Sequence, residues 1–554
     1  MKLRSLLLTG MAGIALSLSA QTHVEGIEYF KAEQYNNAYE LLKRNFNNPG
    51  TDKSLSDYYL GQIELMSQDK DKFEKAAKIF NEGISADPNN PYNYVGLGYI
   101  ALLKDKDVKA AEKLFKEAES KDKKDFSLQM EIARAYYNAD PVGYKEKYEK
   151  KIENALKKDK TNPDIYILQG DILRDEAYQT EESRTYGSAA AKYDMATSND
   201  PTSAVAYVKY ADMYTNVKSY DYAIKKLQEL LQNNPTSALG QRQLAELFYD
   251  TQQYDKAADQ YGKYVNNPSH FKSDENRYLL ILFGGQKYKE GYDYATKLLA
   301  ENPDNFTAQS YQFINAAQIP EMEGQLLPLA EKLIATKKAN PDYQLAQIHY
   351  MLIPDELAKV GRSDEAIALL QEGMAEQPNN GALNQALTSV YMKMQEYGQA
   401  ADAYQGYLDK TANPKETDYA TGALYNYYGG MQYSTLNQPD KANEYFNKGN
   451  ALAQKAAATN PNWYKPYKIM GDIASAANPD NQANAAAPSY IKAIELYEAQ
   501  PEDSYKQDAK NMYYTLAFYY NQKGDSAAAR NAIDKALEID PENANFQNLS
   551  NAIK

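Results

Sequence analysis

The chain has 554 residues, a formal net charge of −14 and no cysteine. This length is too great for one compact core, so we expect several domains or an open-ended array of repeats. The negative balance argues against sequence-independent binding of DNA or RNA and against an anionic membrane as the main partner. The lack of cysteine excludes disulfides, thiol catalysis and thiolate metal sites.

The amino terminus, MKLRSLLLTGMAGIALSLSAQT, has Lys2 and Arg4, an apolar run over 6–18 and small residues that end at Ala20. This is the three-part layout of a secretory signal peptide, and the run is too short to span a bilayer. We expect residues 1–20 to be removed, so that the mature chain begins at Gln21. The predicted location is the periplasm, with secretion or surface association as alternatives and no membrane insertion after cleavage.

Beyond the signal peptide, the chain repeats one pattern, which residues 201–235 show clearly. An apolar stripe with the spacing of one helix face is formed by Tyr207, Tyr210, Ala211 and Tyr214. A turn near Ser219, with Tyr220 beside it, leads to a second periodic stripe, and Pro235 closes the unit. These four tyrosines are therefore predicted to be structural, whereas Tyr222 has no assigned packing role.

The order of an aromatic, Leu-Gly or Leu-Ala, Tyr, a turn, Ala, an aromatic and a closing Pro resembles the tetratricopeptide repeat. Closing prolines 201, 235, 268 and 303 are 34, 33 and 35 residues apart. The resemblance covers nearly the whole mature chain. It implies an all-α, right-handed α-solenoid of about 14 helix pairs, in which each pair buries its apolar stripe against its neighbours.

Changes in spacing divide the predicted array into three parts. These are an N-terminal array at 21–303, irregular repeats at 304–378 and a C-terminal array of longer, insertion-bearing repeats at 379–554. Pro320 and Pro328 interrupt the irregular part, which we expect to be a joint and to allow a hinge between two lobes.

Three further departures from the repeat lead to local predictions. The insertion in 168–196 is expected to lengthen both helices of its pair. The segment 469–494 contains Asn-Pro-Asp-Asn, which predicts a surface loop. Gly429-Gly430 predicts a broken or bent helix.

Residues that could support catalysis are scattered. His23, His270 and His349 are far apart and lack the spacing of zinc ligands. The segment GLGYIA at 96–101 fits a dinucleotide fingerprint, but it lies inside a predicted helix and not after a strand. We therefore predict no catalytic residue, cofactor or metal site, and no enzyme activity.

The resemblance implies that the first helix of each pair lines a groove that holds extended peptides or partner domains. Positions opposite the core stripe, at i, i+4 and i+7, give the candidate groove residues Asp212, Arg242, Glu246, Tyr249, Tyr514, Phe518 and Asn521. Tyr514 and Phe518 have two interpretations. They are either exposed aromatic rings for recognition or contacts for a capping helix after Pro541.

These features predict a non-catalytic scaffold in the bacterial cell envelope that holds segments of one or more envelope proteins in a superhelical groove. One alternative is a glycan-binding envelope protein with aromatic platforms. This would be similar to SusD-type nutrient receptors, which are normally anchored through a cysteine that this chain lacks. Another alternative is a structural or self-assembling envelope subunit.

Overall fold

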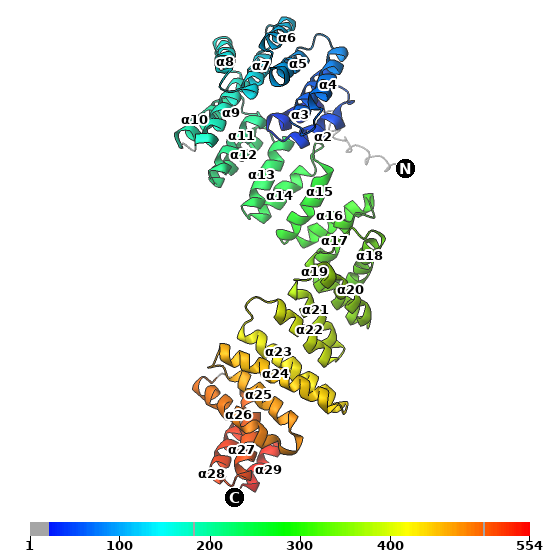
Figure 1. The fold of residues 1–554 in the computed structure, drawn as a ribbon, viewed down its shortest axis with the longest axis vertical. Coiled ribbons are helices and arrows are strands. Elements are labelled where there is room, and N and C mark those ends of the chain that lie inside the picture. The colour runs from blue at the N-terminus through cyan, green and yellow to red at the C-terminus, as the bar shows by residue number, and fades with distance from the viewer. Residues whose placement is uncertain (1–21, 181–182, 502–504, 554) are drawn as a thin grey trace, which may run out of the picture. The chain divides into compact units, whose positions relative to one another are not determined.

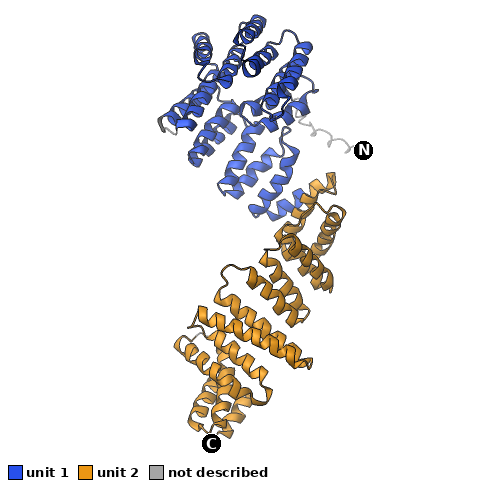
Figure 2. Cartoon of the chain, viewed as in Figure 1, with its two compact units in different colours: residues 1–295 blue, residues 296–554 orange. Residues whose placement is uncertain are grey.

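The structure is a computed structural model that describes residues 22–180, 183–501 and 505–553. The predicted signal peptide therefore lies outside the described residues. Within them the chain folds into 29 α-helices, a π-helical turn and two short 3₁₀ helices, without a β-strand (Figure 1). The chain divides into two compact units, residues 1–295 (unit 1) and 296–554 (unit 2), as Figure 2 shows. The predicted subdivision at 303 and 378 stays a prediction, as does the hinge.

Consecutive helices form 14 pairs, followed by a single last helix. The first seven pairs are α1 (His23–Lys31) with α2 (Tyr35–Asn45), α3 (Lys53–Leu65) with α4 (Lys72–Ala86), α5 (Tyr92–Ile100) with α6 (Val108–Lys121), α7 (Phe126–Ala139) with α8 (Lys145–Lys158), α9 (Pro163–Thr180) with α10 (Ser183–Asn199), α11 (Ala204–Asn216) with α12 (Tyr220–Asn233) and α13 (Ala238–Asp250) with α14 (Tyr254–Tyr264). The eighth pair is α15 (Lys272–Gly284) with α16 (Tyr288–Glu301), which runs across the division between the units. The π-helical turn η1 (Ala101–Asp105) extends α5.

Unit 2 continues the array. Its pairs are α17 (Phe306–Ala316) with α18 (Leu326–Ala339), α19 (Gln347–Lys359) with α20 (Ser363–Glu376), α21 (Gly381–Lys393) with α22 (Tyr397–Lys410), α23 (Glu416–Thr435) with α24 (Pro439–Thr459), α25 (Tyr464–Ala477) with α26 (Gln482–Ala499) and α27 (Lys506–Gln522) with α28 (Ser526–Ile539), before the last helix α29 (Ala544–Ala552). The 3₁₀ helices are η2 (Pro320–Gln325) and η3 (Pro479–Asn481). The predicted all-α array of about 14 helix pairs is therefore confirmed.

The turn inside a pair repeats one backbone conformation. A residue with positive φ follows the first helix in eight pairs: Glu33, Lys218, Gln252, Gln286, Gly361, Gln395, Asn437 and Gly524. In a ninth pair, Lys106 has positive φ after the π-helical turn η1. In the eight pairs a second feature recurs. The next N–H then bonds to a carbonyl five residues back, for example Gln253 to Phe248 at 2.8 Å and Asp525 to Tyr520 at 2.9 Å. This is the Schellman pattern, which favours glycine. Because most of the eight residues are polar non-glycines, the sequence signals this turn only weakly.

The core of a pair forms where a small residue of the first helix meets a ring of the second. A Cβ added to Gly170 in α9 would lie 2.6 Å from Cε1 of Tyr193 in α10, a fully buried ring. Ala211, Ala245 and Ala517 are buried at the corresponding position of their pairs. Close helix crossing therefore explains the small residues, as the repeat pattern predicted.

The glycine pair of α23 corrects one prediction. Gly429 and Gly430 were expected to break or bend a helix; α23 runs unbroken from Glu416 to Thr435, so the break is absent, and the bend stays a prediction. A Cβ at Gly430 would overlap the ring of Phe446 in α24, and one at Gly429 would lie 3.2 Å from the Cα of Gly398. The glycines therefore allow neighbouring helices to approach closely, and this packing outweighs their low helix propensity.

The two insertions behave differently. The first lengthens both helices of its pair, since α9 has 18 residues and α10 has 17, against 13 in α11. The second was expected to be a surface loop, but most of 469–494 belongs to α25 and α26, and only a short connection around η3 separates them. The Asn-Pro-Asp-Asn motif thus marks the turn inside a lengthened helix pair.

Tyr210, Tyr214 and Tyr222 of the segment 206–223 form a packed series, whereas Tyr220, which was predicted to be structural, is 39% exposed. Tyr207 and Tyr210 are buried, and the ring of Tyr214 lies 5.3 Å from that of Tyr210. Tyr222 is 57% exposed, yet its ring stacks on Tyr214 at a centroid distance of 5.3 Å. Tyr222, which had no role assigned from the sequence, therefore makes a contact between α11 and α12, the two helices of the pair.

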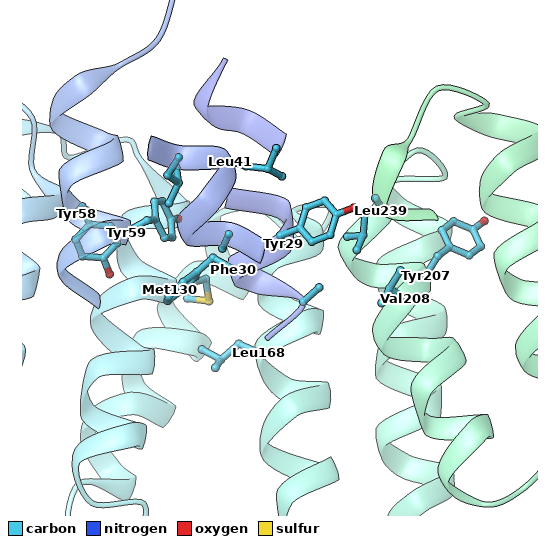
Figure 3. Close-up of a cluster of buried hydrophobic side chains, with 14 of the residues drawn as sticks. Tyr29, Phe30, Leu41, Tyr58, Tyr59, Met130, Leu168, Tyr207, Val208 and Leu239 are labelled. Atoms are coloured by element: carbon cyan, nitrogen blue, oxygen red, sulfur yellow. The ribbon is translucent and has the colours of Figure 1, made fainter. Parts of the chain in front are cut away.

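In unit 1 the first helix pair contacts more than its neighbour in sequence. Helix α1 packs on α3 and also on α11 and α13. Figure 3 shows Tyr29 and Phe30 of α1 among side chains of distant helices, including Met130, Val208 and Leu239. Tyr29 is fully buried, and its ring meets the edge of Phe271 at 5.3 Å. Unit 1 therefore folds back on itself, with α1 across the inner side of later pairs.

Candidate functional site

Polar contacts attach the end of α1 to the first helices of later pairs. Lys31 Nζ lies 3.1 Å from Asp164 Oδ1 at the start of α9. Glu33, in the turn after α1, accepts from Lys209 Nζ of α11 at 2.6 Å, and Arg174 Nη1 of α9 lies 2.8 Å from the same carboxylate. These contacts fix α1 against α9 and α11, so the inner side of unit 1 is partly covered by its own first helix.

Asp171 of α9 is the centre of the buried part of this network. Its side chain is 4% exposed and accepts from Arg134 Nη1 at 2.8 Å and from the Tyr193 hydroxyl at 2.8 Å, while Lys209 Nζ lies 2.9 Å away. Burial alone would raise the pKa of Asp171, but Lys209 and Arg134 outweigh burial and hold the pKa of its carboxyl well below the usual range. The network is therefore charged in the folded state.

Two hollows lie beside α1. The first, here called the inner cavity, has a volume of about 190 Å³ and lies between the α1–α2 turn and helices α3, α5, α7 and α9. The second, here called the loop groove, has a volume of about 820 Å³ and lies along α1 on the side where α9 and α11 begin. The volume of the loop groove falls in the range of roughly 300–1,000 Å³ that is typical of ligand sites. Both hollows include Lys31 in their walls.

The loop groove combines apolar and acidic side chains. Val24, Ile27 and Leu55 form apolar parts of its wall, and Val24 is 52% exposed. The acidic side chains in the wall are Glu28, Asp159, Asp164 and Asp200. Asp164 pairs with Lys31, and the remaining carboxyls leave the groove with an excess of negative charge.

Glu28 of α1 is a half-buried acid of the loop groove. Burial, followed by the nearby Glu25, raises the pKa of Glu28 to about 7, with a further contribution from Asp200 and an opposing one from Lys31. The carboxyl is therefore partly protonated near neutral pH. A cation that entered the groove would favour its ionised form.

Glu28→Gln is expected to stabilise the protein at pH 8 by about 1–2 kcal/mol relative to its effect at pH 4.5. The pKa of Glu28 is 4.5 in the unfolded chain and about 7 in the folded protein, so the wild type loses stability as the pH rises from the first value past the second. Glutamine does not ionise, so the variant does not lose this stability. Urea unfolding at both pH values measures the difference. Glu117→Gln, on an exposed face of α6, is the control, and an equal pH response of the two variants would contradict the expectation.

The candidate groove residues of unit 1 follow one line of contacts along α11, α13 and α15. Asp212 accepts from Gln243 at 3.4 Å, and Arg242 Nε donates to Asp274 at 2.7 Å. Glu246 accepts from Arg277 at 3.0 Å, and the same guanidinium lies 4.2 Å from the ring centre of Tyr249. The line also meets the α1–α2 turn, because Arg242 Nη1 lies 3.5 Å from Gln34 Oε1.

The other candidates lie on α27 in unit 2. The ring of Tyr514 stacks on Phe546 of α29 at 5.0 Å, so the capping-helix contact considered for this residue is present. Phe518 remains 43% exposed, and Asn521 is half-buried. A role of any candidate in partner binding stays a prediction.

Sequence reasoning identified positions on the first helices but missed both hollows. Their walls depend on α1 and on connections between pairs, such as residues 159–164 and 200–205. The spacing i, i+4 and i+7 selects residues on a helix, so it could not identify residues in these connections. The one available sequence signal was the cluster of acidic residues at the ends of second helices, which is also common on plain solvated surfaces.

The three histidines have separate local contacts. The ring of His23 accepts from the Asp52 N–H at 3.1 Å, and His270 lies 3.1 Å from Glu275. His349 is buried beside Ser310 at 2.8 Å, and burial lowers its pKa. Among the described residues, no group of three or more His, Cys, Asp or Glu side chains could hold a metal ion.

In the same part of the chain, no helix combines the length and apolar character needed to cross a membrane.

The geometry defines an α-solenoid of stacked helix pairs, and comparison with known proteins agrees. A family model described as "Tetratricopeptide repeat" matches residues 357–421, which include α20, α21 and α22. The same two-helix unit continues on both sides of this segment. The segment 357–421 therefore carries tetratricopeptide repeats, and the resemblance predicted from the sequence pattern is confirmed.

Solved structures give weaker likenesses. The C-terminal part of a TPR repeat-containing protein from Cytophaga hutchinsonii is 19% identical, covers 50% of this chain and 98% of its own, and has a TM-score of 0.40. YrrB, described as a TPR protein with an unusual peptide-binding site, is 17% identical over 40% of this chain and 99% of its own, with a TM-score of 0.27. These scores add nothing to the family assignment. No curated protein matches the sequence at a significant level.

Proposed function

We propose that this tetratricopeptide-repeat protein is a non-catalytic scaffold of the bacterial cell envelope that holds a segment of a partner protein in the loop groove of unit 1. The observation that carries the proposal is the groove itself, a hollow of about 820 Å³ with an exposed apolar residue, Val24, beside acidic side chains. The envelope location rests on the signal-peptide pattern of residues 1–20.

The groove wall suggests the chemistry of the partner segment. Glu28 and Asp200 favour a lysine or arginine side chain, and Val24, Ile27 and Leu55 favour an apolar neighbour of that basic residue. The partner is therefore a protein segment in which basic and apolar residues stand close together. Residues Asp212, Arg242, Glu246 and Tyr249 are a second surface for such a segment, and their own ion pairs would have to rearrange to bind it.

Site-specific photo-crosslinking tests the proposal. The mature protein with Val24 replaced by p-benzoylphenylalanine is expected to crosslink to a discrete envelope protein, whereas the same replacement at Val142, which is 84% exposed, is not. A synthetic peptide with the crosslinked sequence is then titrated. Glu28→Lys combined with Asp200→Lys is expected to weaken its binding at least tenfold, because the charge in the groove is reversed.

Equal crosslinking from positions 24 and 142 would overturn the groove as the site. Unchanged peptide affinity in the charge-reversed variant, with its thermal unfolding intact, would overturn the basic character of the partner. Large assemblies in sedimentation without any crosslinked partner would instead support a structural subunit. Loss of binding in Arg242→Glu alone would move the site to the line of contacts on α11, α13 and α15.

A further inference from the structure

The inner cavity is separate from the loop groove in chemistry. Its walls come from the α1–α2 pair and from the first helices of the next four pairs, and include the rings of Phe30, Tyr35, Tyr58, Tyr99 and Tyr137. At roughly 30 Å³ of liquid volume for each molecule, its 190 Å³ correspond to about six waters. This is smaller than a drug-sized site of roughly 300–1,000 Å³ and suits one ring-sized molecule.

The charged groups of the cavity already have partners within the protein. Lys31 pairs with Asp164, Arg134 with Asp171, and Arg174 with both Glu33 and Asp175. Glu131, which is 6% exposed, accepts from the Tyr58 hydroxyl at 2.9 Å. Since each cation has its own carboxylate, a ligand with a full charge would have to compete with a formed ion pair.

Neutral groups provide the free hydrogen-bonding capacity. Tyr35, Tyr99 and Gln62 line the cavity, and their hydroxyls and side-chain amide have no hydrogen-bond partner among the described residues. Tyr99 is 8% exposed and Gln62 is 7% exposed, so bulk water scarcely reaches them. Polar groups that line a cavity without a protein partner are available to a bound water or ligand.

The protonation of the two tyrosines supports the same chemistry. Burial, with smaller contributions from Glu33 and from the neighbouring tyrosine, raises the pKa of Tyr35 and of Tyr99 to about 12. Both hydroxyls are therefore neutral at physiological pH. They can donate and accept hydrogen bonds next to aromatic faces on which a ring with an apolar side can pack.

We infer that the inner cavity binds one small neutral molecule that carries several hydroxyl groups on a ring, of the size of a single sugar or cyclitol. The hydroxyls of Tyr35 and Tyr99 and the amide of Gln62 contact the ligand hydroxyls, and the tyrosine rings contact its apolar side. The paired charges around the cavity keep it selective for neutral ligands. This site does not depend on the loop groove, and the protein would then respond to a small molecule as well as to a partner segment.

Isothermal titration of the mature protein tests the inference with glucose, galactose, N-acetylglucosamine and myo-inositol as probes. At least one of these neutral probes is expected to bind with a one-to-one stoichiometry, whereas the charged analogues glucuronate and glucosamine are expected to bind at least tenfold more weakly. Tyr99→Phe and Gln62→Leu, which remove free polar groups without adding charge, are each expected to weaken binding by about tenfold.

Tyr222→Phe is the matched control, because this hydroxyl belongs to an exposed ring outside the cavity. Its affinity for the probe is expected to equal that of the wild type. Absence of binding by every neutral probe at millimolar concentration would overturn the inference and leave a water-filled cavity. Tighter binding of a charged analogue, or unchanged affinity in both cavity variants with thermal unfolding intact, would overturn it as well. Crosslinking from position 24 is measured separately, so failure here is distinguishable from failure of the scaffold proposal.

Discussion

Asp171→Ala is expected to lower the free energy of unfolding of unit 1 by about 3–5 kcal/mol. The carboxylate is nearly fully buried and contacts Arg134, Lys209 and the Tyr193 hydroxyl. Its removal leaves Lys209, with a side chain only 2% exposed, to share Glu33 with Arg174. Urea unfolding of the mature protein, followed by circular dichroism, measures the loss.

Two control variants test whether the loss of stability in Asp171→Ala comes from the buried network. Lys78→Ala removes an exposed pair with Glu82 and is expected to change stability by less than about 1 kcal/mol. Combining Asp171→Leu with Lys209→Met removes opposite charges together and is expected to be less destabilising than Asp171→Ala alone, because the buried cation Lys209 is removed with its carboxylate and only Arg134 is left without its ion pair. A loss in Asp171→Ala no larger than that in Lys78→Ala would contradict the buried network.

Gly170→Ala and Gly187→Ala are expected to have opposite effects, although both lie in the α9–α10 pair. A Cβ at position 170 would lie 2.6 Å from the buried ring of Tyr193, so overpacking is expected to destabilise the protein by about 1–3 kcal/mol. Position 187 has no atom within 4 Å of an added Cβ. Alanine there is expected to stabilise the helix by about 0.5–1 kcal/mol.

Thermal unfolding of the two variants, measured in parallel, tests the packing of this pair. The double variant is expected to show roughly the sum of the single effects, because only position 170 meets the ring of Tyr193. The same sign of change in both variants would contradict the assignment of Gly170 to the close crossing of α9 and α10.

The helix pairs could be predicted from the sequence because their signals are local. Apolar stripes, small residues such as Ala211 and Ala245, and closing prolines all fall within one repeat of about 34 residues. The predictions that were wrong also concerned short segments of the sequence. Gly429 and Gly430 carried the propensity signal of a break, but their role depends on Phe446 and Gly398 in other helices, which a propensity argument does not contain.

The site could be predicted only in part. Spacing along a helix selects a face, and it placed Asp212, Arg242, Glu246 and Tyr249 on neighbouring helices that the structure joins through contacts. No spacing rule links Gln34 to Gln243, whose side chains lie 3.1 Å apart. The two hollows exist because of such distant contacts, so they had no signature in the repeat pattern.

The return of the first helix pair onto later ones has a consequence for how the chain reaches its native state. Arg44 of α2 donates to the carbonyl of His270, which closes a loop over most of unit 1, and the pair of Lys31 with Asp164 closes a shorter loop inside it. Loops of this length slow folding, because chain entropy is lost before the contacts form. A chain that emerges amino terminus first therefore leaves Tyr29 without its contact to Phe271 until residues near 270 have followed. By contrast, the described long-range bonds of unit 2, such as that between Tyr464 and Asp508, join adjacent pairs, so unit 2 can grow pair by pair.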